Sequence, residues 1–186
     1  MSELRQSIPL PDGRQVYIRT IAAVDIPAVK AFFESLSPAS IRYFLPHPYT
    51  EPVLRRRIER AQNGDDLVYV ATCADRIVGY FFLWNFRWPV PLLGIGLADD
   101  FQNLHLGQKF MAILIDDARA AGRDGVELTT MLDNDRAFHV YEKTGFKYIG
   151  NVENVQGDGK VVTERAMFFP IKPNAQPMKI PHACPE

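Results

Sequence analysis

The chain has 186 residues, of which 47% are hydrophobic, and a net charge of −1 at pH 7. This length and apolar content are typical of one globular domain with a substantial core, and the balanced charge indicates neither a nucleic-acid nor a membrane partner. No apolar run reaches the roughly 18 residues of a membrane-spanning helix, and charges and prolines occupy Met1–Leu10, where a signal peptide has its apolar segment. Cys73 and Cys184 make no disulfide framework, so we expect a reduced cytoplasmic protein.

The first half of the chain predicts a strand, three helices and a pair of strands. Val16–Ile21 alternates between apolar and polar residues like a half-buried strand, and Asp12-Gly13 before it is a hairpin-turn signal. Val24–Leu36 has a helical apolar stripe, with Asp25 as its expected N-cap. The other elements expected here are helices at Pro38–Leu45 and Glu51–Gln62 and strands at Leu67–Cys73 and Ile77–Phe86.

The second half alternates strands and helices. Leu92–Ala98 is an apolar strand that contains two glycines, and the next helix repeats an apolar residue at every fourth position from Leu106 to Ala118. Prolines are frequent from Pro170 onward, so we expect one domain over residues 1–170 with a mixed sheet and a proline-rich C-terminal arm over residues 171–186. The remaining expected elements are strands at Val126–Leu132, Phe146–Val155 and Val161–Phe169 and a helix at Asp135–Lys143.

Several short segments of the second half resemble a known family. They are Leu93-Gly94-Ile95-Gly96-Leu97-Ala98-Asp99-Asp100-Phe101-Gln102, Leu106-Gly107, Asn134-Asp135-Arg136-Ala137 and Tyr141-Glu142-Lys143-Thr144-Gly145-Phe146. Through them, the chain from Val16 to about Phe169 resembles the GCN5-related N-acetyltransferase (GNAT) superfamily. The resemblance implies an α/β (α+β) GNAT fold with a mixed, mostly antiparallel sheet of six to seven strands and about four helices. The sheet should be splayed between its fourth and fifth strands, Leu92–Ala98 and Val126–Leu132.

The resemblance also implies that acetyl-CoA is the co-substrate and binds at this splay. A bulge at Gly94 and Gly96 would open the sheet, and backbone N–H groups near Gly96 and Leu97 would polarise the thioester carbonyl. Tyr141 would be the general acid that protonates or hydrogen-bonds the departing thiolate. The pantetheine arm would contact Asn134 and Ala137, and the pyrophosphate would bind the turn at the helix start that contains Gln102, Asn103, Leu104, His105, Leu106 and Gly107.

The turn departs from the family pattern Gln/Arg-x-x-Gly-x-Gly/Ala at one position. Gln102 and Gly107 match, but His105 stands at the middle glycine, where a β-carbon can force the loop out of shape. The histidine could block the pyrophosphate, or it could turn outward and add a positive charge. Taken alone, the segment would equally fit a plain strand-to-helix turn. Asn134 could also be a plain N-cap, and Tyr141 could be an aromatic residue packed on the sheet.

The sequence does not identify the general base that direct transfer to an amine requires. Leu92 stands where many relatives carry a glutamate, and Asp99 and Asp100 could equally be solvated turn residues or caps. Glu127 is a candidate only if it faces the cleft. A group of aromatic residues falls where the family forms its acceptor site. These residues could pack in the core, line an apolar acceptor pocket or form a partner surface. These are Tyr43, Phe44, Tyr49, Trp84, Phe86 and Trp88.

We therefore predict an acetyl-CoA-dependent N-acetyltransferase that transfers the acetyl group directly to an amine acceptor, either a small molecule or a peptide. The alternative is a non-catalytic GNAT-fold module that binds another ligand or a protein, which His105, Leu104 and Leu92 favour. His47 and His139 lack metal-ligand spacing, so no metal is expected. No nucleic acid and no membrane is expected as a partner, and a homodimer stays open.

Overall fold

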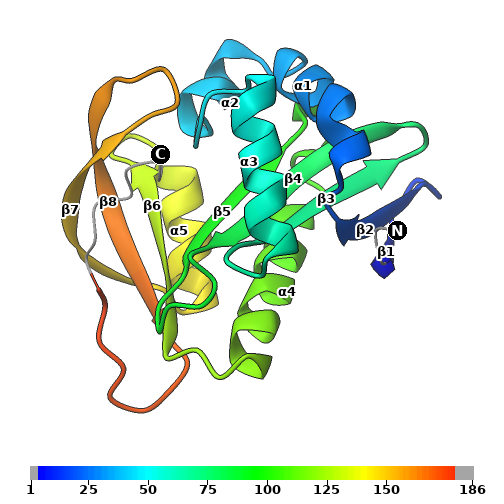
Figure 1. Cartoon of the computed structure of the whole chain (residues 1–186). Coiled ribbons are helices and arrows are strands. Elements are labelled where there is room, and N and C mark those ends of the chain that lie inside the picture. Colours follow the sequence, from blue (N-terminus) through cyan, green and yellow to red (C-terminus); the bar gives the residue numbers. More distant parts are fainter. Residues whose placement is uncertain (1–3, 179–186) are drawn as a thin grey trace.

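An eight-stranded sheet forms the centre of the protein (Figure 1). The structure, a computed structural model, describes residues 4–178. The strands lie in the order β1-β2-β3-β4-β5-β6-β8-β7. They are β1 (Leu4–Pro9), β2 (Gln15–Thr20), β3 (Leu67–Cys73), β4 (Arg76–Trp84), β5 (Leu92–Leu97), β6 (Gly125–Met131), β7 (Lys147–Val155) and β8 (Val161–Pro170). The helices are α1 (Ile26–Glu34), α2 (Pro38–Tyr43), α3 (Glu51–Gln62), α4 (Leu106–Ala120) and α5 (Asp135–Thr144).

This architecture confirms the expected mixed, mostly antiparallel fold, but it contains one strand more than the upper expected count. The additional strand is β1, which pairs antiparallel with β2 across the turn at Asp12-Gly13. Gly13 adopts a φ of 86°, as the turn signal requires. Ile8 is the buried residue of β1, and the rest of that strand is exposed, so its sequence carries too little apolar alternation to be recognised as a strand.

The sheet divides between β5 and β6. β4 and β5 pair continuously from Trp84 opposite Leu92 to Gly79 opposite Leu97. By contrast, within residues 4–178 β5 and β6 pair at one position, where Leu92 lies beside Glu127. The two strands diverge beyond that pair, and this confirms the expected splay.

Helices cover both faces of the sheet, and neighbouring residues of β4 contact different layers. The ring of Tyr80 meets Phe33 of α1 at a centroid distance of 5.6 Å, on the face that α3 also covers. The ring of Phe81 stacks on Phe110 of α4, 4.2 Å away, on the opposite face. Figure 1 shows α3 and α4 on opposite sides of the central strands.

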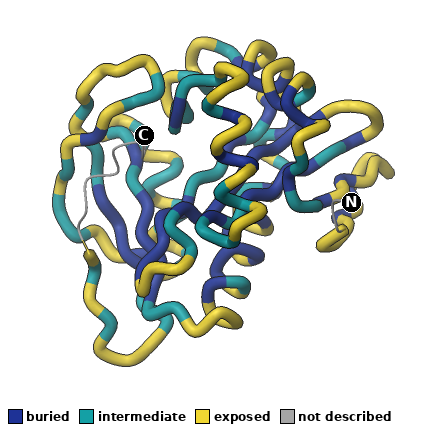
Figure 2. The backbone as a smooth tube through the Cα atoms, viewed as in Figure 1, coloured by how far each residue is buried: buried dark blue, intermediate teal, exposed yellow. Residues whose placement is uncertain are grey.

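The core lies along the central strands, where the buried residues concentrate in Figure 2. It includes polar groups that are paired. The carboxylate of Asp66 accepts two hydrogen bonds of 2.8 Å from Arg60 and lies 3.6 Å from the guanidinium of Arg57. His47 is fully buried, with Nε2 3.2 Å from the hydroxyl of Tyr80. Burial lowers the pKa of His47 to about 4, so this imidazole is neutral at pH 7.

The segment after β8 is tied to the domain by polar contacts. The N–H groups of Ile171 and Lys172 both donate to the carbonyl of Asp124 at 2.9 Å. The N–H of Met178 donates to the Glu127 carboxylate at 2.5 Å. The remainder of the expected C-terminal arm, with Cys184, lies outside the described residues. Within residues 4–178, no helix combines the length and the apolar character needed to cross a membrane.

Candidate active site

A cleft of about 690 Å³ lies at the split of the sheet, between α2, β5, the start of α4, β6 and α5. Arg42 of α2 forms an exposed ion pair with Asp133, the residue that follows β6 by two positions. Every predicted site residue except Leu104 lines this cleft; Leu104 is half-buried and packs against the core instead. The lining residues from that prediction are Gly96, Leu97, Gln102, Asn103, His105, Leu106, Gly107, Asn134, Ala137 and Tyr141.

The turn before α4 has left-handed backbone at two positions that are not glycine. Asn103 has a φ of 64° and His105 a φ of 58°. Backbone of this kind brings successive N–H groups together into a concavity that binds anions. No side chain of residues 4–178 caps α4 at His105, so the first N–H groups of the helix are not used by a cap. His105 therefore adopts a left-handed conformation that glycine adopts at lower cost.

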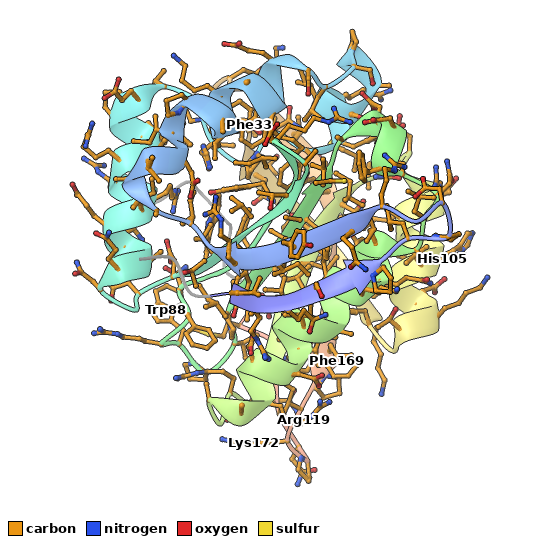
Figure 3. The ribbon with its side chains drawn as sticks, turned by 90° about the vertical axis from the view of Figure 1, so that its right-hand side faces the viewer. Phe33, Trp88, His105, Arg119, Phe169 and Lys172 are labelled. Carbon is orange, nitrogen blue, oxygen red and sulfur yellow. The ribbon has the colours of Figure 1, made fainter. Side chains whose placement is uncertain are left out.

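The ring of His105 does not fill the turn. The side chain is exposed, with Nδ1 3.0 Å from Oε1 of Gln108, and Figure 3 shows it at the outer edge of the molecule. Arg136 of α5 lines the cleft and donates to the side-chain oxygen of Asn103 at 2.5 Å. Sequence reasoning missed Arg136 as a binding group, although it lies inside the Asn134–Ala137 segment. The turn thus has a guanidinium beside it.

Replacing His105 with glycine is expected to raise the free energy of unfolding by about 0.5–1 kcal/mol. The left-handed conformation costs a side chain about 1–2 kcal/mol, and the larger entropy of glycine in the unfolded chain offsets part of the gain. Urea unfolding measures the difference. The matched control is His139→Gly in α5, whose free energy of unfolding should fall by about 1 kcal/mol. If the free energy of unfolding falls equally in both variants, the turn is not strained.

Asp99 is a structural anchor. Its carboxylate accepts hydrogen bonds from the N–H and the hydroxyl of Ser37, at 2.7 and 3.1 Å, and from the hydroxyl of Ser40. These bonds, that of Ser40 first, hold the pKa of Asp99 below its usual value. Gln102 donates to the Ser40 hydroxyl at 3.0 Å, so its side chain joins α2 to the turn. Asp100 forms an exposed ion pair, and neither aspartate lines the cleft.

Asn134, Ala137 and Tyr141 lie on one face of α5 and line the cleft together. The side-chain oxygen of Asn134 accepts the N–H of Ala137 at 3.2 Å, which makes Asn134 the N-cap of α5. The ring of Tyr141 contacts Phe146, and its hydroxyl has no hydrogen-bond partner within residues 4–178. Burial, with a smaller effect of the Glu164 carboxylate, raises the pKa of Tyr141 to about 12. The phenol is therefore protonated at neutral pH.

The two glycines of β5 accommodate aromatic rings. A Cβ on Gly96 would lie 2.3 Å from two ring atoms of Phe44, and a Cβ on Gly94 would lie 2.2 Å from the ring of Phe82. The expected bulge at these glycines is wrong, because β4 and β5 keep one continuous register. The split arises instead because the pairing of β5 with β6 ends at Leu92.

A second cavity of about 90 Å³ lies beside the first, and both are lined by Tyr43, Phe44 and Thr129. Trp84, another member of the predicted aromatic group, also lines it. The rest of that group does not: Tyr49 stacks on Phe33, Phe86 packs against the core, and Trp88 is exposed. Glu127 is buried and lines neither cavity. Polar residues of this cavity that the sequence did not single out are Thr129, Asn154, Gln156 and Glu164.

Comparison with known proteins identifies the family. The family model described as the acetyltransferase (GNAT) family matches residues 29–146. The chain belongs to the GNAT acetyltransferase family. The matched range contains the split, the turn before α4 and Tyr141. A search of curated proteins found no match.

Solved structures share this GNAT fold over most of the chain. The ribosomal-protein-S5-alanine acetyltransferase of Vibrio fischeri is 14% identical, covers 92% of this chain and 100% of its own, and has a TM-score of 0.72. The ribosomal-protein-S18-alanine N-acetyltransferase of Escherichia coli is 18% identical, with coverages of 89% and 98% and a TM-score of 0.66. The yncA protein of Salmonella typhimurium, solved with acetyl-CoA, is 18% identical, with coverages of 89% and 99% and a TM-score of 0.68. At these identities the likeness concerns the fold.

Proposed function

We propose that this GNAT-family protein is an acetyl-CoA-dependent N-acetyltransferase that transfers the acetyl group directly to an amine. The observation that carries the proposal is the composition of the cleft. One cavity at the split of the sheet contains both a turn with left-handed backbone, which suits an anion, and a tyrosine hydroxyl without a hydrogen-bond partner in residues 4–178. A neighbour of the same fold, the yncA protein, was solved with acetyl-CoA.

The groups along the cleft match the successive parts of acetyl-CoA. The N–H groups at the start of α4, assisted by Arg136, would bind the pyrophosphate, since a helix N-terminus favours negative charge. The edge of β5, which within residues 4–178 has no strand partner on the β6 side beyond Leu92, offers its backbone to the amides of the pantetheine arm. A backbone N–H near Gly96 or Leu97 would polarise the thioester carbonyl.

Tyr141 would stabilise the leaving thiolate by donating a hydrogen bond. A thiol ionises near pH 8.5, so complete proton transfer from a phenol of pKa about 12 to a free thiolate is uphill by roughly 5 kcal/mol. The raised pKa of Tyr141 therefore favours a hydrogen bond that strengthens as negative charge develops on the sulfur. The solvent would then complete the protonation of CoA.

The acceptor class that we propose is the α-amine of a protein or peptide. The Vibrio fischeri and Escherichia coli neighbours are named for alanine residues of ribosomal proteins. An α-amine ionises at about 7.7–8.0 and is partly neutral at physiological pH, whereas lysine ionises at about 10.4. Only the neutral amine attacks, so an α-amine needs less help from the protein. Such an acceptor fits the cytoplasmic location expected from the sequence.

Calorimetric titration of the CoA-stripped protein with acetyl-CoA tests this function. We expect micromolar affinity and a stoichiometry of one to one. Acetyl-pantetheine, which lacks the pyrophosphate, is the matched ligand and should bind at least tenfold more weakly, because it cannot use the turn. Absence of heat and of thermal stabilisation at millimolar acetyl-CoA would favour the non-catalytic binding module instead.

A further inference from the structure

The second cavity combines an aromatic wall with one buried polar cluster. The side-chain amide of Asn154 donates to Glu164 at 2.5 Å and to the hydroxyl of Thr129 at 3.0 Å. Asn154 is 7% exposed, and Glu164 is half-buried. Polar groups buried beside apolar rings are costly unless they are hydrogen-bonded, and a satisfied network holds its members in one arrangement. The carboxylate of Glu164 is therefore held at a defined place in the cavity wall.

The strand register places this cluster on one side of the split. The pairing of β6, β7 and β8 puts Thr129, Asn154 and Glu164 on the same face of the sheet. The next residue of β8, Arg165, faces the other side, where it forms a 2.8 Å ion pair with Asp135 of α5. Glu164 thus faces away from the layer of α5, which carries Tyr141.

The two cavities adjoin each other at the split of the sheet. Leu93, Gly94 and Thr129 line both cavities. The Glu164 carboxylate is near enough to contribute to the raised pKa of Tyr141. An acyl group that lies at the split therefore has the tyrosine on one side and the glutamate on the other. This is the arrangement that a displacement requires, because the nucleophile and the leaving group need separate proton partners.

We propose that the second cavity receives the amine end of the acceptor and that Glu164, oriented by Asn154, accepts the proton from the attacking nitrogen. This inference rests on the proposed acetyltransferase function. The nitrogen forms a bond to the thioester carbon as the C–S bond breaks. The N–H proton passes to Glu164 and then to solvent, and the thiolate leaves hydrogen-bonded to Tyr141 and takes a proton from solvent. One proton is lost from the amine and one is gained by CoA, so the reaction balances.

The cavity also indicates the form of the acceptor. Its volume of about 90 Å³ admits a few non-hydrogen atoms, and rings of Phe44, Phe82 and Trp84 form its apolar wall. Aromatic faces and a carboxylate together attract an amine in its cationic form, and the bound cation releases one proton to solvent before the neutral nitrogen attacks. The acceptor would insert an amine on a short, small stem. Alaninamide, an α-amine beside a methyl group, is a small peptide-like compound with these features.

The test is acetyl transfer to alaninamide by the full chain, followed as CoA release and as acetylated product. Glu164→Gln keeps the shape of the side chain and should lower kcat at pH 7.5 by about 100-fold, because positioned general bases contribute about 10²–10⁴. Its acetyl-CoA affinity should stay within twofold, since Glu164 does not line the first cleft. The remaining acidic limb of the pH–rate profile in the variant should follow the ionisation of alaninamide alone, because only the neutral amine attacks.

Glu153→Gln is the matched control, because this exposed residue of β7 undergoes the same chemical change outside both cavities. It should retain wild-type turnover. Asn154→Ala should move the acidic limb of the profile and lower kcat less than Glu164→Gln does. A Glu164→Gln variant with unchanged turnover overturns the proposal. n-Butylamine, which has the amine and alkyl stem of a lysine side chain, is the second acceptor. A wild-type protein that binds acetyl-CoA but acetylates neither alaninamide nor n-butylamine also overturns the proposal. Failure to bind acetyl-CoA instead ends the proposed function itself.

Discussion

Tyr141→Phe is expected to lower kcat by about 100-fold or more while the Kd for acetyl-CoA stays within about twofold. The substitution removes one hydroxyl, which has no hydrogen-bond partner within residues 4–178, and leaves the ring against Phe146. The ground state of the complex loses little. The transition state loses a donor at the sulfur, where negative charge develops. Steady-state kinetics and calorimetry on the same preparation measure the two quantities.

Tyr148→Phe is the matched control for this experiment. Tyr148 is 50% exposed on β7, and its hydroxyl donates to Asn151 at 2.9 Å, away from the cleft. The control should turn over at the wild-type rate. If Tyr141→Phe keeps its turnover, the tyrosine is a packing residue. If it instead weakens acetyl-CoA binding by the same factor as kcat/KM, the hydroxyl contributes to ground-state binding.

Gly96→Ala should both destabilise the protein and weaken acetyl-CoA binding. The new Cβ would lie 2.3 Å from the ring of Phe44, so the ring must move, and Phe44 lines both cavities. Overpacking of this kind costs about 1–3 kcal/mol. The displaced ring should also reduce acetyl-CoA affinity at least tenfold. Urea unfolding and calorimetry report the two effects.

A double-mutant cycle identifies the cause of the Gly96→Ala effect. In a Phe44→Ala background the ring is absent, so Gly96→Ala should cost much less than in the wild type. The coupling energy between the two positions should be about 1–2 kcal/mol. Additive effects would show that the alanine acts on the β5 backbone and that the aromatic contact is not the reason for the glycine.

The sequence predicts best the features that depend on local spacing. Asn134, Ala137 and Tyr141 are four and seven positions apart on one helix, so their common face follows from helix geometry. Asp12-Gly13 likewise predicts its turn from backbone conformation alone. The splay follows from the family resemblance.

Features that depend on contacts between distant segments could not be predicted. Glu164 and Asn154 meet because of the register of β7 and β8. The alternation of apolar and polar residues in a strand does not show which residues of the neighbouring strand it pairs with. The reason for Gly96 lies in the ring of Phe44, which is far away in the sequence. The sequence left open whether a histidine at position 105 distorts the turn. In the structure, the backbone of His105 is left-handed.

The single pair between β5 and β6 has a mechanical consequence. At that end, Leu92 and Glu127 hold the two parts of the sheet together. Toward the mouth, α2 and the segment after β6 are joined by the exposed pair of Arg42 and Asp133, and such pairs contribute about 1 kcal/mol or less. Arg136 and Asn103 also join the two parts, as does the hydrogen bond of 2.8 Å from the N–H of Gly157 to the carbonyl of Leu45. Because these contacts are few and mostly polar, a ligand bound along β5 would add to the forces that keep the two parts of the sheet in one arrangement.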